Sequence, residues 1–150
     1  MDTEEVRGLL RHLVATIAYR GGLALRDAPA GFGAFSAGAG MRTPGELVRH
    51  LTGLMYFAQS LLSGGERPEV PTLDWDAQIA GFQVALRALD ATLAALPRWA
   101  TDPRTALQGP LADALTHIGQ LIMLRRMAGA PIAGGRYPWA DIRAGDVGLG

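Results

Sequence analysis

Asp113 and His117 are the two residues of this chain whose types and spacing most clearly point to chemistry. They lie four residues apart within the mostly apolar run PLADALTHIGQLIMLRRMAG. In a helix, side chains at this spacing lie side by side, about 5–6 Å apart at Cβ. A carboxylate and an imidazole in such surroundings bond to each other, pair with an arginine, or bind a metal ion together.

The other two histidines are expected to differ in their surroundings. At about 100° per residue, His12 falls well away from the apolar stripe of its predicted helix, which places it at the surface. His50 lies on the flank of an apolar stripe, next to Leu54 and Phe57. It is therefore expected to be half-buried and to face a neighbouring helix. Taken alone, a histidine of this kind is more often a hydrogen-bonded residue at the edge of the core than a metal ligand.

One ligand from a facing helix would complete a three-ligand set with Asp113 and His117. Three protein ligands leave coordination positions open to water or substrate, as in catalytic metal sites. Imidazole and carboxylate ligands suit zinc, nickel, iron and manganese, so ligand type alone does not select the metal. Gln120 lies beside His117. It either hydrogen-bonds to a ligand, or supports a ligand residue from behind or lies on the helix surface.

Four segments with helical periodicity must position these residues. The second of them begins with the run TPGE, in which Thr43, Pro44 and Glu46 form a capping box with proline at the first helical position. Four amphipathic helices of about 20 residues predict an all-α fold, an antiparallel-type four-helix bundle that forms a single domain over residues 1–150. The predicted helices are Thr3 to Arg26, Pro44 to Ser63, Asp74 to Leu96 and Pro110 to Ala128.

Two irregular segments complete the predicted fold. The first connection, DAPAGFGAFSAGAGMR, is long for a link between adjacent helices. It is expected to cross one end of the bundle or to cover a site. The tail GGRYPWADIRAGDVGLG is too rich in glycine for a helix. We expect this C-terminal tail to pack across one end of the bundle. Tyr137 and Trp139 are expected to cap the hydrophobic end of the bundle rather than to line the mouth of a pocket.

The composition excludes several classes of function. The 150 residues are 49% apolar and 19% charged, with a formal net charge of zero, which is typical of a globular protein. No basic stripe suggests a nucleic-acid partner. The chain has no cysteine, which excludes disulfides and cysteine nucleophiles. The acidic N-terminal run MDTEEVRGLL is neither a signal peptide nor a membrane span, so we expect a cytoplasmic protein without a membrane partner.

The runs TPGELVRHLTGLMYFAQSLL and DALTHIGQLIMLRRMAG, with the later RRMAGAPI and YPWADI, resemble the DinB/YfiT-like superfamily. The resemblance implies a four-helix bundle in which three histidines bind a divalent metal ion in many members. One comes from the second helix, and two lie four residues apart on the fourth. His50 and His117 match two of these positions, and Asp113 stands at the third in place of histidine. Two histidines and one carboxylate leave a divalent ion one net positive charge, which could shift metal preference or abolish binding.

The resemblance also implies a reaction class. Some members of the superfamily use low-molecular-weight thiols, as S-transferases or as a thiol-dependent isomerase. A divalent ion deprotonates a coordinated thiol, and a chain without cysteine must take its thiol from outside. Arg49, Arg125 and Arg126 could attract the carboxylates of such a thiol, or a phosphate. Taken singly, each is more often a solvated arginine at the end or edge of a helix. We therefore expect a divalent-metal-dependent enzyme, a thiol-dependent S-transferase acting on a small molecule, with zinc or nickel ranked before iron or manganese.

Two other functions fit the same residues. The triad could be a buried hydrogen-bond network in a non-catalytic bundle that acts as a binding or stress-associated module without metal. Two histidines and one carboxylate also describe mononuclear iron oxygenases, which usually have other folds.

The outer face of the fourth helix gives one expectation about assembly. Leu111, Leu115, Ile118, Ile122 and Met123 point away from the Asp113 face, so this helix is apolar nearly all round. One chain does not easily cover both sides of such a helix. This pattern suggests a homodimer, or extra cover from the C-terminal tail.

Overall fold

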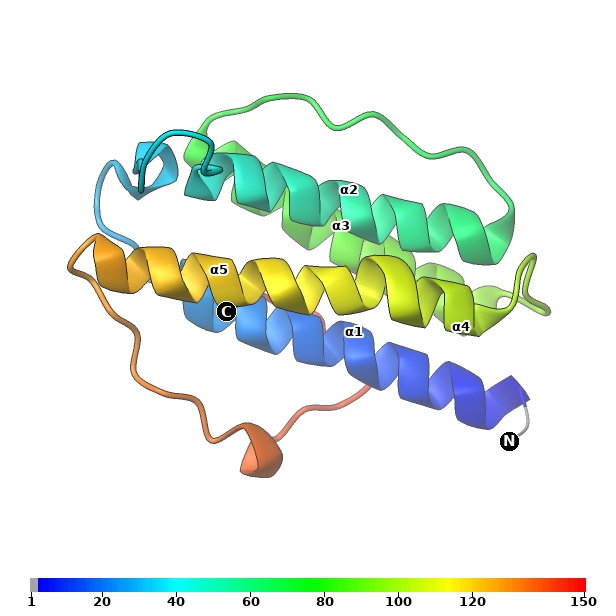
Figure 1. The fold of residues 1–150 in the computed structure, drawn as a ribbon. Coiled ribbons are helices and arrows are strands. Elements are labelled where there is room, and N and C mark those ends of the chain that lie inside the picture. The colour runs from blue at the N-terminus through cyan, green and yellow to red at the C-terminus, as the bar shows by residue number, and fades with distance from the viewer. Residues whose placement is uncertain (1–2) are drawn as a thin grey trace.

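The computed structural model describes residues 3–150, which form helices joined by irregular segments without any strand. Four long helical rods lie side by side (Figure 1). They are α1 (Thr3–Leu25), α2 (Pro44–Ser63), α3 (Trp75–Ala95), and a fourth rod made of α4 (Pro103–Ala106), the turn η2 (Leu107–Leu111) and α5 (Ala112–Met127). The all-helical prediction is confirmed.

Local capping explains where α2 and α3 begin and end. The Thr43 hydroxyl accepts a hydrogen bond from the Glu46 amide, and the Glu46 carboxylate accepts one from the Thr43 amide, so the predicted capping box is present. Gly64, with φ of 76°, takes the left-handed conformation that ends α2. The Asp74 carboxylate caps α3 by accepting from the Ala77 amide. These bounds agree with the sequence prediction to within two residues.

The fourth rod begins earlier than predicted. Asp102 caps α4 by accepting from the Arg104 amide, and the chain is helical from Pro103. Pro110 was expected to start the helix, because it lacks an amide hydrogen and obstructs the preceding turn. The rod instead passes through Pro110 by a wide turn in which Gly109 has non-helical angles (φ −91°, ψ −106°). This local kink allows α5 to continue the direction of α4 (Figure 1).

α2 and α3 run in the same direction, which corrects the antiparallel arrangement expected from the sequence. Near the start of both helices lies the short turn η1 (Phe32–Ala34): the Phe32 ring packs edge-on against Trp75, and Gly33 lies close to Gly45. Near their other ends, the Ala100 amide donates to the Leu62 carbonyl. Parallel neighbours need a connection as long as the helices themselves, and residues 64–74, called the strap here, provide it (Figure 1).

One continuous apolar core lies between the four rods. It includes Ile17 of α1, Leu51 of α2, Phe82 of α3 and Leu121 of α5, which are fully buried. Within residues 3–150, no helix is both long enough and apolar enough to cross a bilayer.

The packing of the fourth rod weakens the reason given for a homodimer but does not test it. Leu111 and Ile118 were expected to need a partner, yet both are buried within this chain. Met123 remains 53% exposed. The predicted need for outside cover is therefore reduced to a small part of α5.

The C-terminal tail packs along the side of α1 and α3, which corrects the expectation that it crosses one end. Val147 and Leu149 are buried, and the Gln83 side chain donates to the Val147 carbonyl and accepts from the Leu149 amide. Gly22 of α1 allows this close approach, because a Cβ there would lie 2.4 Å from the Leu149 carbonyl oxygen.

The aromatic residues of the tail do not cap the core. Trp139, in the turn η3 (Tyr137–Trp139), is 78% exposed. Tyr137 packs edge-on against Tyr19 and lies under the guanidinium of Arg20, both on the surface of α1.

Candidate metal centre

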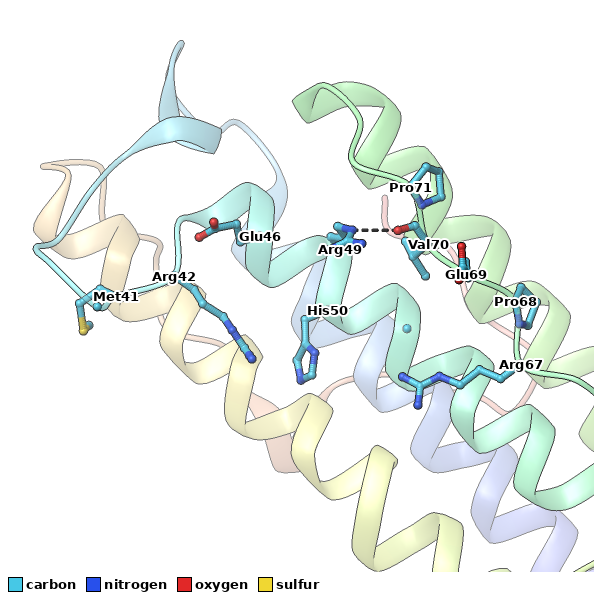
Figure 2. A pocket seen from close by; sticks show the side chains of 12 residues that line it. Met41, Arg42, Glu46, Arg49, His50, Arg67, Pro68, Glu69, Val70 and Pro71 are labelled. Carbon is cyan, nitrogen blue, oxygen red and sulfur yellow. Dashed lines mark hydrogen bonds between the residues drawn. The ribbon is translucent and has the colours of Figure 1, made fainter.

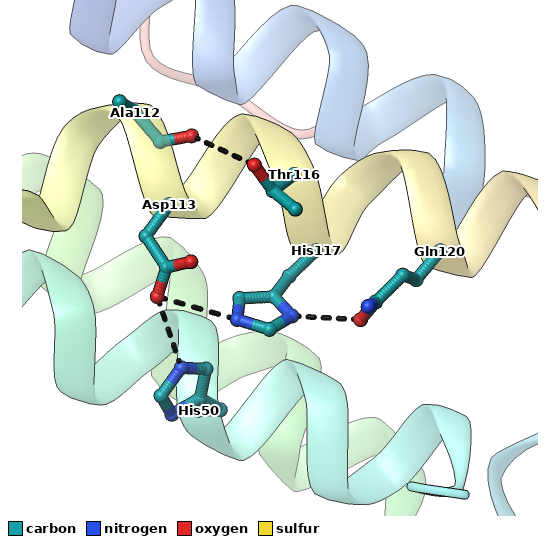
Figure 3. A network of polar contacts seen from close by, with 6 residues as sticks. All are labelled: His50, Ala112, Asp113, Thr116, His117 and Gln120. Atoms are coloured by element: carbon teal, nitrogen blue, oxygen red, sulfur yellow. Dashed lines mark hydrogen bonds and ion pairs between the residues drawn. The ribbon is translucent and has the colours of Figure 1, made fainter.

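His50, Asp113 and His117 come together where α2 packs against α5. One ligand atom from each residue can be chosen so that all three atoms lie within 4.8 Å of one another. The His50 and His117 rings are perpendicular, with centroids 4.5 Å apart. Figure 3 shows the carboxylate of Asp113 between the two imidazoles. The three predicted site residues are therefore brought together, and the cluster could hold a metal ion.

Helix geometry fixes the directions of these side chains. Asp113 and His117 lie one turn apart on α5, so they project side by side toward α2. His50 projects from the facing side of α2, beside the buried Leu51 and Leu54. Because the neighbouring positions belong to the core, the two helices hold the cluster on rigid elements rather than on loops.

The distances within the cluster suit a shared ion better than direct hydrogen bonds. The Asp113 Oδ2 atom lies 3.4 Å from His50 Nε2 and 3.3 Å from His117 Nε2. Charge-assisted hydrogen bonds between nitrogen and oxygen are shorter, about 2.7–2.9 Å. Ligand atoms about 2.0–2.2 Å from a tetrahedral metal ion lie about 3.3–3.6 Å from each other. The observed separations match that second range.

Gln120 orients one of the imidazoles. Its Oε1 atom lies 2.7 Å from His117 Nδ1 (Figure 3). An amide oxygen only accepts, so Nδ1 carries the hydrogen and donates it. In the neutral imidazole, Nε2 then has a free lone pair directed at the centre of the cluster. This arrangement matches the usual support of a metal-bound histidine, whose other ring nitrogen donates to an oxygen. Gln120 thus contacts a candidate ligand residue from behind, which is one of the roles expected for it.

The surroundings of His50 favour its neutral form. Its pKa lies below the ordinary value, first because burial penalises the imidazolium and next because Arg42 carries a positive charge nearby. The Asp113 carboxylate acts in the opposite direction but does not outweigh these effects. Since metal ions bind only neutral imidazole, the direction of this shift keeps His50 available as a ligand.

The cluster is neither sealed nor fully exposed. The side chains of His117, His50 and Asp113 are 12%, 31% and 45% exposed. Solvent and small molecules can therefore reach the cluster from the Asp113 side. A bound ion would keep positions open for other ligands, because the chain supplies three ligand residues.

A groove of about 1050 Å³ begins at His50. Its walls are the end of the first connection, one face of α2 and the middle of the strap (Figure 2). Three arginines and two glutamates line it: Arg42, Arg49, Arg67, Glu46 and Glu69.

The arginines singled out from the sequence have other roles. Arg125 is 5% exposed, and its guanidinium donates to the carbonyls of Ala24, Arg26, Asp27 and Ala130. It therefore fixes the chain after α1, and both sequence interpretations of Arg125, a ligand-binding or a solvated arginine, are wrong. Arg126 is exposed at the end of α5, away from the groove lining.

Arg49 lines the groove, but its Nε atom donates to the Val70 carbonyl of the strap at 2.8 Å. His12 is exposed on α1, as predicted. Sequence reasoning missed Arg42 and Arg67, because both lie in connections whose path no periodicity reveals.

No family model, curated protein or solved structure matches this chain. What the site does must therefore be argued from its own geometry.

Proposed function

We propose that His50, Asp113 and His117 bind a divalent metal ion and that the protein is a metal-dependent enzyme. The fold would be a four-helix bundle of the DinB/YfiT-like type, with Asp113 at a position where that superfamily commonly has histidine. Zinc or nickel is the preferred ion, because two imidazoles and one carboxylate are ligand types that suit both.

One observation carries the proposal: three ligand atoms from two helices lie within 4.8 Å of one another, and the two distances to Asp113 Oδ2 are those expected between ligands of one ion. The orientation of His117 by Gln120 and the lowered pKa of His50 both support it, because each favours an imidazole nitrogen with a free lone pair. The partial exposure of Asp113 leaves room for a further ligand.

The proposed reaction is a transfer that uses a low-molecular-weight thiol. A divalent ion would lower the pKa of a bound thiol, so that the thiol would react as thiolate near neutral pH. The chain's own part is to hold the site open and to orient its ligands. His117 is held by Gln120, and the packing of α2 against α5 fixes His50 opposite Asp113.

The direct test is a metal titration with matched histidine variants. Purified protein is stripped with a chelator, and zinc or nickel is titrated while affinity and thermal stability are measured. We expect tight binding to the unaltered chain and a loss of about 100-fold or more for His117→Ala. The control is His12→Ala, which removes an exposed histidine outside the cluster and should bind as the unaltered chain does.

Two results would overturn the proposal. One is an unaltered chain that shows no metal-dependent stabilisation and contains no metal by elemental analysis. The other is equal affinity in His117→Ala and His12→Ala. Either result would leave the triad as a hydrogen-bond network in a non-catalytic helical protein.

A further inference from the structure

Two arginines flank His50 in the groove, one from each connection that adjoins α2. Arg42 belongs to the first connection and Arg67 to the strap. Figure 2 shows both guanidiniums directed toward the open space beside His50, Arg42 on the α5 side and Arg67 on the strap side. Their charges therefore face a molecule that approaches His50 along the groove.

The structure holds Arg67 in place. Its guanidinium lies 4.6 Å from the centre of the Phe57 ring, and an added Cβ at Gly53 would lie 3.5 Å from its Nη2 atom. His50, Gly53 and Phe57 follow one another at three- and four-residue steps, so they share one face of α2. Arg67 thus lies along the helix face that carries His50, about one turn further on.

The strap that carries Arg67 is itself anchored. Arg49 donates to the Val70 carbonyl, and the Gln78 side chain accepts from the Leu73 amide. Pro68 and Pro71 limit the backbone angles between these points. The position of Arg67 is therefore set by the strap and not by a freely moving loop.

Neither guanidinium is neutralised by the protein. Within residues 3–150, Arg42 and Arg67 form no ion pair and no hydrogen bond, whereas Arg49 in the same groove is engaged by Val70. Of the two groove glutamates, Glu46 accepts from the Thr43 amide in the capping box. Two unpaired cations beside a metal site repel the ion, and an anion bound between them would remove that repulsion.

We propose that the groove binds a small molecule with two acidic groups, one at Arg42 and one at Arg67, and delivers it to the metal centre. This inference rests on the proposed metal site and names the class of its substrate. Arginine suits the role, because its planar guanidinium binds carboxylate or phosphate oxygens in pairs. The groove volume of about 1050 Å³ accommodates a molecule of this size.

The test is calorimetric binding of malonate, succinate and glutarate to the zinc-loaded protein, with acetate as the single-acid comparison. We expect one of the diacids to bind at least 10-fold more tightly than acetate. Arg42→Gln and Arg67→Gln should each weaken that diacid by about 10-fold. Arg87→Gln is the control. Arg87 is exposed on α3, and its substitution removes the same charge outside the groove lining.

A separate experiment tests whether the two acidic groups are phosphates or carboxylates. Inorganic phosphate is titrated into metal-free protein, since phosphate precipitates zinc, and succinate is titrated under the same conditions. Loss of phosphate binding in the two arginine variants supports a phosphorylated ligand, and loss of succinate binding supports a carboxylated one. Two results overturn the proposal. One is that both variants bind phosphate and succinate as tightly as the unaltered chain does. The other is that the zinc-loaded protein binds acetate and all three diacids with equal affinity.

Zinc affinity is measured for every variant in the same series. Arg42→Gln and Arg67→Gln should bind zinc at least as tightly as the unaltered chain, because each removes a positive charge near the ion. If the unaltered chain does not bind zinc, the proposed function fails. Succinate binding to the metal-free variants then decides the groove proposal by itself.

Discussion

Asp90 and Asp113 are two carboxylates that contact nitrogen atoms of a neighbouring helix. They differ in the length of these contacts and in the exposure of their side chains. Asp90 of α3 receives two hydrogen bonds from Arg11 of α1, at 2.8 and 2.9 Å, and its side chain is 11% exposed. Asp113 of α5 lies 3.3 and 3.4 Å from two imidazole nitrogens, and its side chain is 45% exposed.

These distances and exposures indicate that Asp90 belongs to a completed ion pair, whereas Asp113 belongs to a set of candidate ligands. The Arg11 guanidinium cannot lose its proton in the physiological range, and the hydrogen bond to Asp90 raises its pKa further. That pair is saturated and needs no further partner. The nitrogens beside Asp113 can offer lone pairs instead of protons, so this cluster could hold a cation. Four variants can break or sharpen this contrast.

The largest effect is expected at Asp113. Asp113→Ala should weaken zinc binding by about 100- to 1000-fold, because it removes one of three protein ligands. The metal-free variant should unfold at nearly the same urea concentration as the unaltered chain, because Asp113 is half exposed and its contacts are long. Parallel zinc titrations and urea denaturation measure both quantities. A metal-free variant that is strongly destabilised, with zinc affinity intact, would make Asp113 a structural residue like Asp90.

Asp90→Ala should show the opposite pattern. We expect a loss of about 2 kcal/mol in the free energy of unfolding, because Arg11 is left part-buried without its partner. Zinc affinity should be unchanged. The control is Asp141→Ala, which removes an exposed ion pair with Arg143 and should have little effect on unfolding. A zinc affinity that changes with Asp90 would contradict the separation of the two regions.

Gln120→Ala should have an intermediate effect, because it removes the oxygen that orients His117 but no ligand. We expect zinc affinity to fall by about 10-fold, with tetrahedral coordination retained in the spectrum of the cobalt-substituted protein. Gln108→Ala, at an exposed position of the same rod, is the matched control. Equal affinities in the two variants would show that the hydrogen bond to His117 has no role in binding.

The smallest effect concerns acid stability of the metal-free protein. An unfolded histidine takes up a proton near pH 6.5, whereas folded His50 does so only at lower pH, because its pKa is lowered. Stability should therefore fall as the pH drops from about 6.5 toward the pKa of folded His50. Urea midpoints at pH 7.5 and 5.5, in chelator, should differ more for the unaltered chain than for His50→Gln. An equal difference in both proteins would mean that burial of His50 has no effect on its titration.

Local sequence signals predicted much of the fold and brought out the candidate metal ligands. The capping box at Thr43, the cap at Asp74 and the glycine after Ser63 act within a few residues, so their outcome does not depend on the rest of the chain. The spacing of Asp113 and His117 likewise determines that they share a face of one helix. His50 was matched to them by a family resemblance, and its position on the flank of an apolar stripe agreed with that match.

The parts that were missed depend on contacts between distant segments. The parallel direction of α2 and α3 follows from the path of the strap, which carries no periodic pattern. Arg125 reads as a solvated residue at a helix end, yet it is buried by carbonyls that lie about 100 residues away in the chain. Arg42 and Arg67 approach His50 only because the two connections of α2 pass over the same face.

The strap and the first connection have a consequence for how this protein could diversify. The proposed ion-binding side chains sit on helices whose other faces form the core, so changes near them disturb folding. The charges proposed to select the incoming molecule, Arg42 and Arg67, sit on exposed connections outside the core. A new substrate preference could thus arise by exchanging a few residues in these two connections, while the helices and the proposed ion site stay as they are.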